Sequence, residues 1–170
     1  MNEQLTHLQN KFAQKEFPLV LLLDHISSPA NLGSIFRIAD AFGVQKIYIH
    51  ESVDVFTSNR FKRVARSTQN WIAYETFSDK IALVQKLVKD DFDIFALEIT
   101  ENSLPIHQIK FANKKICLVL GDEKYGVSQA ILEKVNTACH IGMFGKNSSM
   151  NVSQATAIAL YEITHQLTSI

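Results

Sequence analysis

The segment PLVLLLDHISSPANLGSIFRIADAFGVQKIYIH, residues 18–50, decides the fold class, because it places an amphipathic pattern between two apolar runs. The run 18–24 is continuously apolar up to a charge and a turn-like stretch, which is typical of a strand buried on both faces. Residues 46–50 have the composition of a second strand, and residues 31–43 fit a helix. A strand, a helix and another strand predict a βαβ unit and therefore a parallel sheet.

The helix predicted over 31–43 raises a question about one of its side chains. Ile35, Ile38, Ala39 and Phe42 recur at the spacing of an apolar stripe that faces a core. Arg37 lies off this stripe, in the second turn of a helix that begins at Asn31, where the helix dipole disfavours a cation. An exposed ion pair with Asp40, three residues later, would explain why an arginine stands here, and so would a role of Arg37 in a functional site.

The remaining chain continues the alternation of helices and strands. It contains no repeat, linker or low-complexity tract, so we expect a single domain over 1–170 with no separate second domain. A narrow apolar stripe predicts a short surface helix over 2–15, and residues 51–70 are polar. The further elements predicted are a helix over 78–90, strands over 91–100 and 114–121, a helix from about 128, a strand over 138–143 and a closing helix over 152–167.

Composition limits the classes of function. The 17 basic and 17 acidic residues leave a formal net charge of +0, so any polyanion must bind a local patch. The two cysteines, Cys117 and Cys139, sit in short apolar runs, which argues against a disulfide framework and favours the cytoplasm. The N-terminal residues lack a signal-peptide run, and no apolar stretch is long enough to span a bilayer, so we expect no membrane association.

The glycines point to a ligand site. All six fall in three places, around the first helix, in LGDEKYG (120–126) and in IGMFGKNSS (141–149). These segments follow predicted strands, and parallel sheets bind ligands at the carboxyl ends of their strands. One interpretation is that three loops converge on one ligand. The other is that these glycines only form ordinary turns and helix caps. The Walker and dinucleotide-binding glycine patterns, the G-x-S-x-G elbow and metal-ligand spacings are all absent, so we expect no metal.

Three segments carry a resemblance to a known family. SPANLGSIFRIADAFGV (28–44), LVLGDEKYGVS (118–128) and IGMFGKNSSMNVSQATAIALYE (141–162) resemble, in this order, the signature motifs of the SpoU/TrmH family of S-adenosylmethionine-dependent RNA ribose 2'-O-methyltransferases, within the SPOUT superfamily. The resemblance implies an α/β domain whose mostly parallel sheet is flanked by helices, with a deep C-terminal trefoil knot. It also implies S-adenosylmethionine as cofactor, tRNA or rRNA as substrate, and a homodimer with active sites at the subunit interface.

The resemblance also assigns roles to individual residues. The catalytic set that it implies is Asn31, Arg37, Glu123, Ser149 and Asn151. Its cofactor-binding set is Leu97, Glu98, Leu120, Gly121, Ile141, Met143 and Met150. In the family the arginine is the proposed general base, but a guanidinium stays protonated in proteins. We therefore expect Arg37 to orient the hydroxyl or a phosphate and to stabilise negative charge, and Glu123 to anchor a loop or Arg37.

RNA binding has one candidate segment, RFKRVAR, residues 60–66. Its cations Arg60, Lys62, Arg63 and Arg66 could contact phosphates, and Phe61 could stack on a base. A solvated charged face would have the same composition. The alternative to an enzyme is a catalytically silent, knotted RNA-binding or assembly module, and a flavodoxin-like nucleotide binder is a third possibility.

Overall fold

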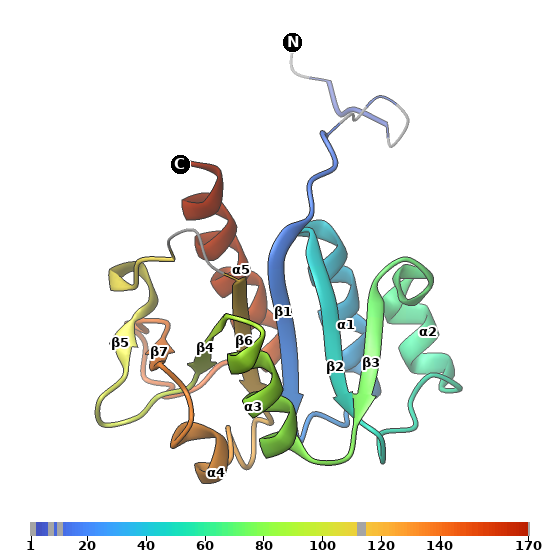
Figure 1. Ribbon diagram of the computed structural model, residues 1–170. Coiled ribbons are helices and arrows are strands. Elements are labelled where there is room, and N and C mark those ends of the chain that lie inside the picture. The colour runs from blue at the N-terminus through green and yellow to red at the C-terminus, as the bar shows by residue number, and fades with distance from the viewer. Residues whose placement is uncertain (1–2, 7–8, 10–11, 112–114, 170) are drawn as a thin grey trace.

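The computed structural model describes residues 3–6, 9, 12–111 and 115–169. Its strands form one seven-stranded sheet in the order β3-β2-β1-β6-β4-β7-β5, in which every paired neighbour is parallel (Figure 1). The strands are β1 (Phe17–Asp24), β2 (Val44–His50), β3 (Ala73–Phe77), β4 (Phe92–Leu97), β5 (Leu104–Pro105), β6 (Lys115–Gly121) and β7 (Thr137–His140). The predicted α/β class with a mostly parallel sheet is confirmed.

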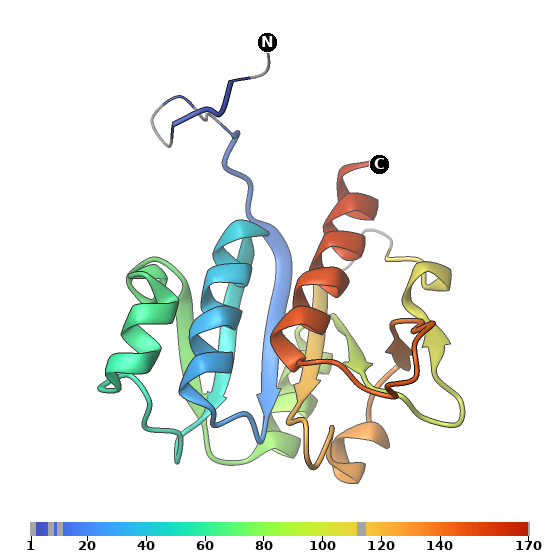
Figure 2. The same ribbon diagram turned by 180° about the vertical axis from the view of Figure 1, so that it is seen from behind.

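Helices cover both faces of this sheet. They are α1 (Pro29–Ala41), α2 (Asn59–Ala65), α3 (Lys80–Lys89), α4 (Gln129–Leu132) and α5 (Val152–Thr168). Helices α1 and α5 lie side by side on one face together with α2 (Figure 2), and α3 and α4 lie on the other. The two faces bury separate clusters of apolar side chains.

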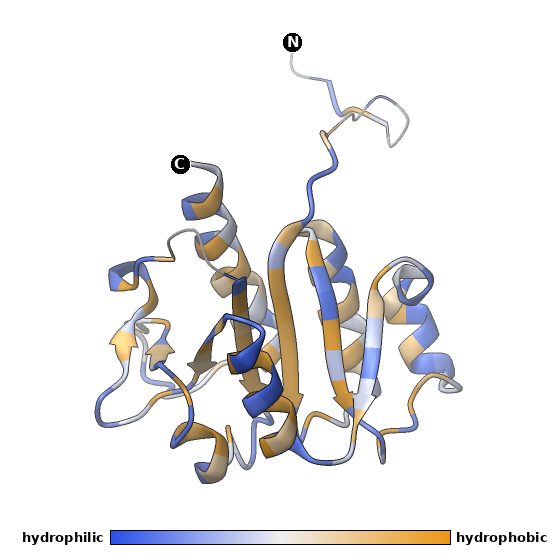
Figure 3. Ribbon diagram, in the orientation of Figure 1, coloured by the Kyte–Doolittle hydropathy of each residue, from blue (hydrophilic) through white to orange (hydrophobic). Residues whose placement is uncertain are grey.

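Strand β1 explains why the sheet needs both layers. Its apolar residues run along almost its whole length (Figure 3), and every residue from Leu19 to Leu23 is almost completely buried. Because successive side chains point to opposite faces, Leu21 packs in the cluster under α1 and α5, whereas Leu22 packs in the cluster under α3. This is the doubly buried strand that the sequence predicts.

Helix α1 begins earlier than the sequence pattern indicates. Ser28 is its N-cap residue and Pro29 occupies the first turn, where the missing proline N–H costs nothing. Arg37 therefore lies in the third turn rather than the second. Because the dipole acts mainly within the first turn, the penalty expected for this cation does not apply. The helix ends as predicted, with Gly43 in the left-handed region at φ +62°.

Several other elements differ from the sequence prediction. Strand β3 is missing from it, since this edge strand is mostly exposed and carries no apolar run. The helix expected from residue 128 is only the four-residue α4, and the strand expected over 138–143 stops at His140. Of the helix expected over 2–15, residues 3–6, 9 and 12–15 are not helical, and the others lie outside the described residues.

Gly33 serves helix packing rather than a ligand. A Cβ at this position would lie 2.9 Å from the Val64 Cβ and 3.0 Å from the Phe61 carbonyl oxygen. The glycine thus lets α1 approach α2 closely, so it does not belong to a ligand-binding loop as the sequence interpretation proposed. Within the described ranges, no helix combines the length and apolarity required to cross a membrane.

Candidate functional site

A pocket of about 480 Å³ opens at the carboxyl ends of β4, β6 and β7. Its walls are the segments that follow these three strands, together with the start of α5. Parallel strands deliver their carboxyl ends to one edge of the sheet, so three loops distant in sequence meet there. Its volume lies within the range of small-ligand pockets.

Most of the residues that the resemblance assigns to the cofactor surround this pocket. Those that line it are Leu97, Glu98, Gly121, Ile141, Met143 and Met150. Leu120 does not line it, because this side chain is fully buried in the core beneath α1 and α5. The lining combines apolar side chains with the carboxylates of Glu98, Asp122 and Glu123. Such a pocket suits a ligand that has both apolar and polar parts.

A hydrogen-bonded cluster joins the three motifs beside the pocket. One oxygen of Glu123, Oε1, accepts from the side-chain amides of Asn31 at 2.5 Å and Asn151 at 3.1 Å. The Asn151 amide also donates to Asn31 Oδ1 at 3.0 Å. Asn151 caps α5, where its Oδ1 accepts from the backbone and the hydroxyl of Ser153. The cluster ties the first turn of α1 to the β6 loop and to the start of α5.

The other two residues of the catalytic set lie outside this cluster. Ser149 is exposed and lines the pocket. Arg37 is exposed on α1, two turns beyond Asn31, and does not line the pocket. Among the described residues it forms neither an ion pair with Asp40 nor a hydrogen bond to Glu123. Its guanidinium is therefore available to a group outside this chain.

The second of the three motifs, residues 118–128, forms a turn that hydrogen bonds hold in place at both ends. Within the turn, the Gly126 N–H donates to the Asp122 carbonyl at 2.7 Å, and Gly126 has φ +64°. At its far end, Glu98 Oε2 accepts from the Val127 N–H at 2.9 Å. The next N–H, that of Ser128, donates to Asp24 Oδ2 at 2.7 Å. Two carboxylates, from the ends of the strands on either side of β6, therefore hold one wall of the pocket.

Asp24 is the buried anchor of this arrangement. Its side chain is only 2% exposed, and its Oδ1 accepts from the Lys80 ammonium at 2.6 Å. Lys80 also reaches Ser128 Oγ and His25 Nε2. Burial raises the pKa of the Asp24 carboxyl. The hydrogen bonds from Lys80 and Ser128 together lower this pKa by more than burial raises it, so the net pKa lies below the ordinary 3.8.

We expect this anchor to make stability depend on acid pH. Because the pKa of Asp24 is lowered by folding, its contribution is complete at neutral pH and is lost as the pH falls below about 4. Asp24→Asn should lower the free energy of unfolding at pH 7 by about 3 kcal/mol, since it leaves Lys80 without an anion. Urea unfolding at pH 7 and pH 3 measures both effects. An Asn variant that loses as much stability between the two pH values as wild type would contradict this role.

His140 is a pocket residue that the sequence interpretation missed. Ser103 Oγ donates to the Thr100 carbonyl at 2.8 Å and contacts His140 Nδ1 at 2.9 Å. The other lining residues outside the predicted set are Ile99, Thr100, Asp122, Lys124, Tyr125, Gly126, Val127, Leu132, Val152 and Ala155. Their position directly after predicted strands, or in the motifs themselves, was the available signal.

The basic segment lies on a different part of the molecule. Arg60, Lys62, Arg63 and Arg66 are exposed on and just after α2, which packs against α1 at the β3 edge of the sheet, away from the pocket (Figures 1 and 2). The expected stacking role of Phe61 is wrong. This ring is 0% exposed and packs edge-on against Phe36 at 5.6 Å, because α2 buries its apolar side on α1.

The cysteine side chains belong to the apolar core. Both cysteines are free and buried, and burial raises the pKa of the Cys139 thiol to about 12. A thiol with such a pKa is a poor nucleophile at neutral pH. Across 3–6, 9, 12–111 and 115–169, no three His, Cys, Asp or Glu side chains come together as a metal site would require.

Known proteins resemble this chain over most of its length. The family model described as the SpoU rRNA Methylase family matches residues 18–161. An uncharacterized tRNA/rRNA methyltransferase of Borreliella burgdorferi is 30% identical over 161 residues, which cover 95% of this chain and 70% of that protein. A tRNA (guanosine(18)-2'-O)-methyltransferase of Saccharomyces cerevisiae is 29% identical over 150 residues, 87% of this chain but only 10% of the yeast protein.

A solved structure has the same architecture. The crystal structure of the Aquifex aeolicus TrmH/SpoU tRNA modifying enzyme superimposes with a TM-score of 0.81 at 26% identity. The match covers 92% of this chain and 78% of the Aquifex chain. The likeness therefore extends from the sequence motifs to the arrangement of the sheet and its helices.

Proposed function

Because this chain belongs to the SpoU rRNA Methylase family, we propose that it transfers a methyl group from S-adenosylmethionine to a ribose 2'-hydroxyl of tRNA or rRNA. The observation that carries the proposal is the Asn31–Glu123–Asn151 cluster beside the pocket. It joins the three family motifs in one place. Relatives named as tRNA 2'-O-methyltransferases support the same reaction.

The pocket fits the cofactor that this reaction requires. S-adenosylmethionine, when bound, supplies the methyl group from its sulfonium. Leu97, Ile141 and Met150 offer apolar surface to an adenine, and backbone groups of the loops can satisfy its polar edge. Glu98 and Glu123 line the same pocket and place negative charge near a cationic ligand.

The chain's own residues would then align and activate the hydroxyl. A ribose 2'-hydroxyl is a poor nucleophile, and holding the reacting atoms in line supplies several kcal/mol. Arg37 remains protonated, so we assign it the orientation of the hydroxyl or an adjacent phosphate and the stabilisation of negative charge. Asn31 and Ser149 would hold the ribose and the arginine fork, while Asn151 and Glu123 keep the loops in place.

Two copies of the chain would complete the site. Arg37 does not line the pocket of its own chain, so an active site shared between copies would give the guanidinium a partner. Ile158 and Tyr161, 44% and 62% exposed on α5, offer an apolar surface for a homodimer. A C-terminal trefoil knot, as in the SPOUT superfamily, also belongs to this proposal. Size-exclusion chromatography with light scattering tests the dimer.

RNA would bind through exposed cations rather than through overall charge. We assign phosphate contacts to Arg60, Lys62, Arg63 and Arg66 on the α2 side. A cytoplasmic site of action suits an enzyme of RNA and the two free buried cysteines.

The decisive experiment follows labelled methyl groups. Purified protein is incubated with radiolabelled S-adenosylmethionine and, separately, bulk tRNA and rRNA from cells that lack this protein, and the RNA is digested to nucleosides. A labelled 2'-O-methylnucleoside from one pool would establish the reaction and the substrate class. Cofactor binding without label in either pool would favour the silent RNA-binding or assembly module.

Glu123 offers a test of the cluster itself. Glu123→Gln should retain transfer within a few fold, because the amide oxygen can still accept from Asn31 and Asn151. Glu123→Ala leaves both amides without their acceptor and should lower kcat/KM by about ten- to a hundredfold. Steady-state kinetics of the two variants show whether Glu123 acts through its loop contacts or through its negative charge. Equal losses in both would show that the negative charge, rather than the loop contacts, is required.

A further inference from the structure

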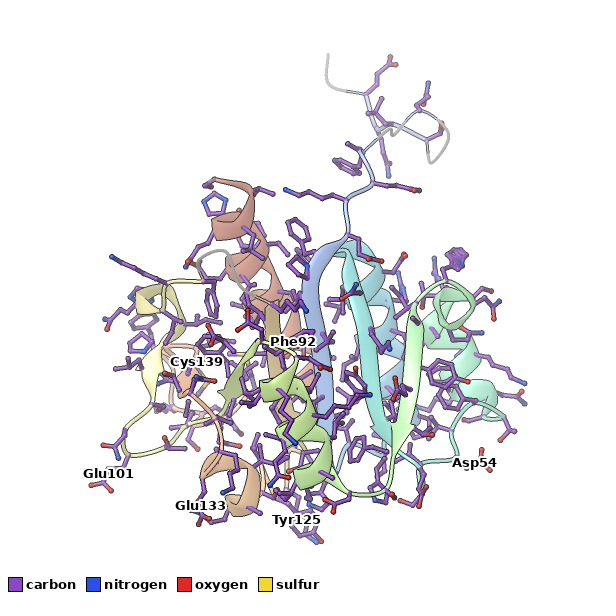
Figure 4. The ribbon with its side chains drawn as sticks, in the orientation of Figure 1. Asp54, Phe92, Glu101, Tyr125, Glu133 and Cys139 are labelled. Carbon is purple, nitrogen blue, oxygen red and sulfur yellow. The ribbon has the colours of Figure 1, made fainter. Side chains whose placement is uncertain are left out.

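Tyr125 is an exposed aromatic side chain at the mouth of the pocket. It is 69% exposed and yet contributes to the pocket lining. Figure 4 shows it at the lower edge of the molecule, beyond the carboxyl ends of the strands. Folding of this chain therefore leaves most of an aromatic ring in water beside the proposed site, where a ligand could cover it.

The ring is held on a rigid support. Asp122 Oδ1 accepts from the backbone N–H groups of Lys124 at 2.8 Å and Tyr125 at 3.3 Å. The same turn is closed by the Gly126 N–H and is tied to β1 and β4 by Asp24 and Glu98. His25 contacts the tyrosine edge-on, with 6.4 Å between ring centroids. A preformed aromatic surface loses little conformational freedom when a ligand covers it.

A lysine beside the ring offers a contact for a phosphate. The Lys124 ammonium lies 4.8 Å from the centroid of the Tyr125 ring. Proteins bind unpaired RNA by stacking its bases on aromatic rings while cations contact its phosphates. Bringing a ribose 2'-hydroxyl to an enclosed site also requires the RNA to leave its regular stack, and an aromatic side chain can replace the stacking that is lost.

We propose that Tyr125 stacks on a nucleobase of the RNA substrate at or next to the target nucleotide, and that Lys124 contacts a phosphate of the same strand. This inference rests on the proposed function, because it takes RNA as the substrate of the pocket. Tyr125 is then a residue that positions RNA. It is distinct from the basic segment on α2, which lies away from the pocket.

Kinetic variants separate stacking from other roles of the ring. Tyr125→Phe keeps the aromatic face, Tyr125→Leu keeps apolar bulk without it, and Tyr125→Ala removes both. Trp71→Ala is the matched control, since Trp71 is 61% exposed, precedes the edge strand β3 and does not line the pocket. The substrate is the RNA pool that accepts methyl groups from the wild-type protein, and the readouts are KM for RNA, kcat and the Kd of S-adenosylmethionine.

The Leu and Ala variants should raise KM for RNA by about ten- to a hundredfold. Their cofactor Kd should stay within about twofold of wild type, and the Phe variant and the Trp71 control should match wild type. A wild-type KM for RNA in Tyr125→Leu would overturn the inference while leaving the proposed function intact. A loss of cofactor affinity in place of RNA affinity would overturn it as well, because the ring would then belong to the cofactor site.

Ultraviolet cross-linking gives a readout that needs no methyl transfer. Labelled bulk tRNA and rRNA are irradiated with the wild-type protein and with Tyr125→Leu, and cross-linked peptides are identified by mass spectrometry. A nucleotide attached at Tyr125 in the wild type, without any transfer, would support the inference while the proposed function fails. If no cross-link forms at Tyr125 and no methyl group is transferred, both the inference and the proposed function are overturned.

Discussion

Replacing Arg37 by alanine is expected to lower the rate of methyl transfer by at least about a hundredfold, which is the scale of losing one preorganised charged donor. The affinity for S-adenosylmethionine should change by no more than a few fold, because Arg37 does not line the pocket of its own chain. Single-turnover transfer and equilibrium binding of the cofactor measure the two quantities separately. A large loss of cofactor binding would mean that the assigned role is wrong.

Two further variants define what Arg37 contributes. Arg37→Lys keeps the positive charge but loses the planar fork that holds an oxygen in two places, so only partial recovery is expected. Asp40→Ala is the matched control on the same helix. Since no ion pair joins Asp40 to Arg37 among the described residues, this variant should transfer methyl groups like wild type. Loss of activity in Asp40→Ala would indicate that the aspartate orients the arginine in the active assembly.

Replacing Gly121 by alanine is expected to reduce the affinity for S-adenosylmethionine by about a hundredfold or more. A Cβ at this position would lie 2.2 Å from the Gly126 carbonyl carbon and 2.3 Å from the Val127 nitrogen, both of them backbone atoms. The turn cannot simply move aside, because Val127 and Ser128 are bonded to the carboxylates of Glu98 and Asp24. Relief of the clash must therefore displace a wall of the pocket.

A second glycine provides the control for this variant. A Cβ on Gly142 would have no neighbour within 4 Å, so Gly142→Ala should keep the cofactor affinity of the wild type. Isothermal titration calorimetry compares both variants, and circular dichroism verifies that each is folded. Equal affinities in the two variants would show that the turn after β6 adjusts without cost, and that the pocket does not depend on this close backbone approach.

The buried elements of the fold could be predicted from the sequence. The apolar run at 18–24, the stripe on α1 and the glycine at its end each reflect short-range physics, namely side-chain periodicity and the φ angle that only glycine adopts easily. The exposed edge strand β3 could not be predicted in this way, because its side chains are not sorted between a core and solvent. A helix was predicted from about residue 128, but the four residues of α4 are too few for periodicity to show where it ends.

The candidate site, too, could be predicted from the sequence only in part. The resemblance located the residues of the three motifs, and six of the seven assigned cofactor residues line one pocket. It could not reveal that Glu123 accepts from Asn31 and Asn151, since Asn31 is 92 and 120 residues away from these partners along the chain. Phe61 was misjudged because a single aromatic residue among cations gives no sign of which side packs on α1.

The sequence by itself determined the α/β class, the parallel sheet and the family to which the chain belongs, and it predicted the carboxyl edge of the sheet as the place of the candidate site. These properties depend on local patterns and on motifs that can be compared one residue at a time. Only the tertiary structure decided the contacts of Glu123, the Asp24–Lys80 anchor and the exposed position of Tyr125. Each of these depends on how strands far apart in sequence are ordered in the sheet, because that order decides which loops meet at its edge.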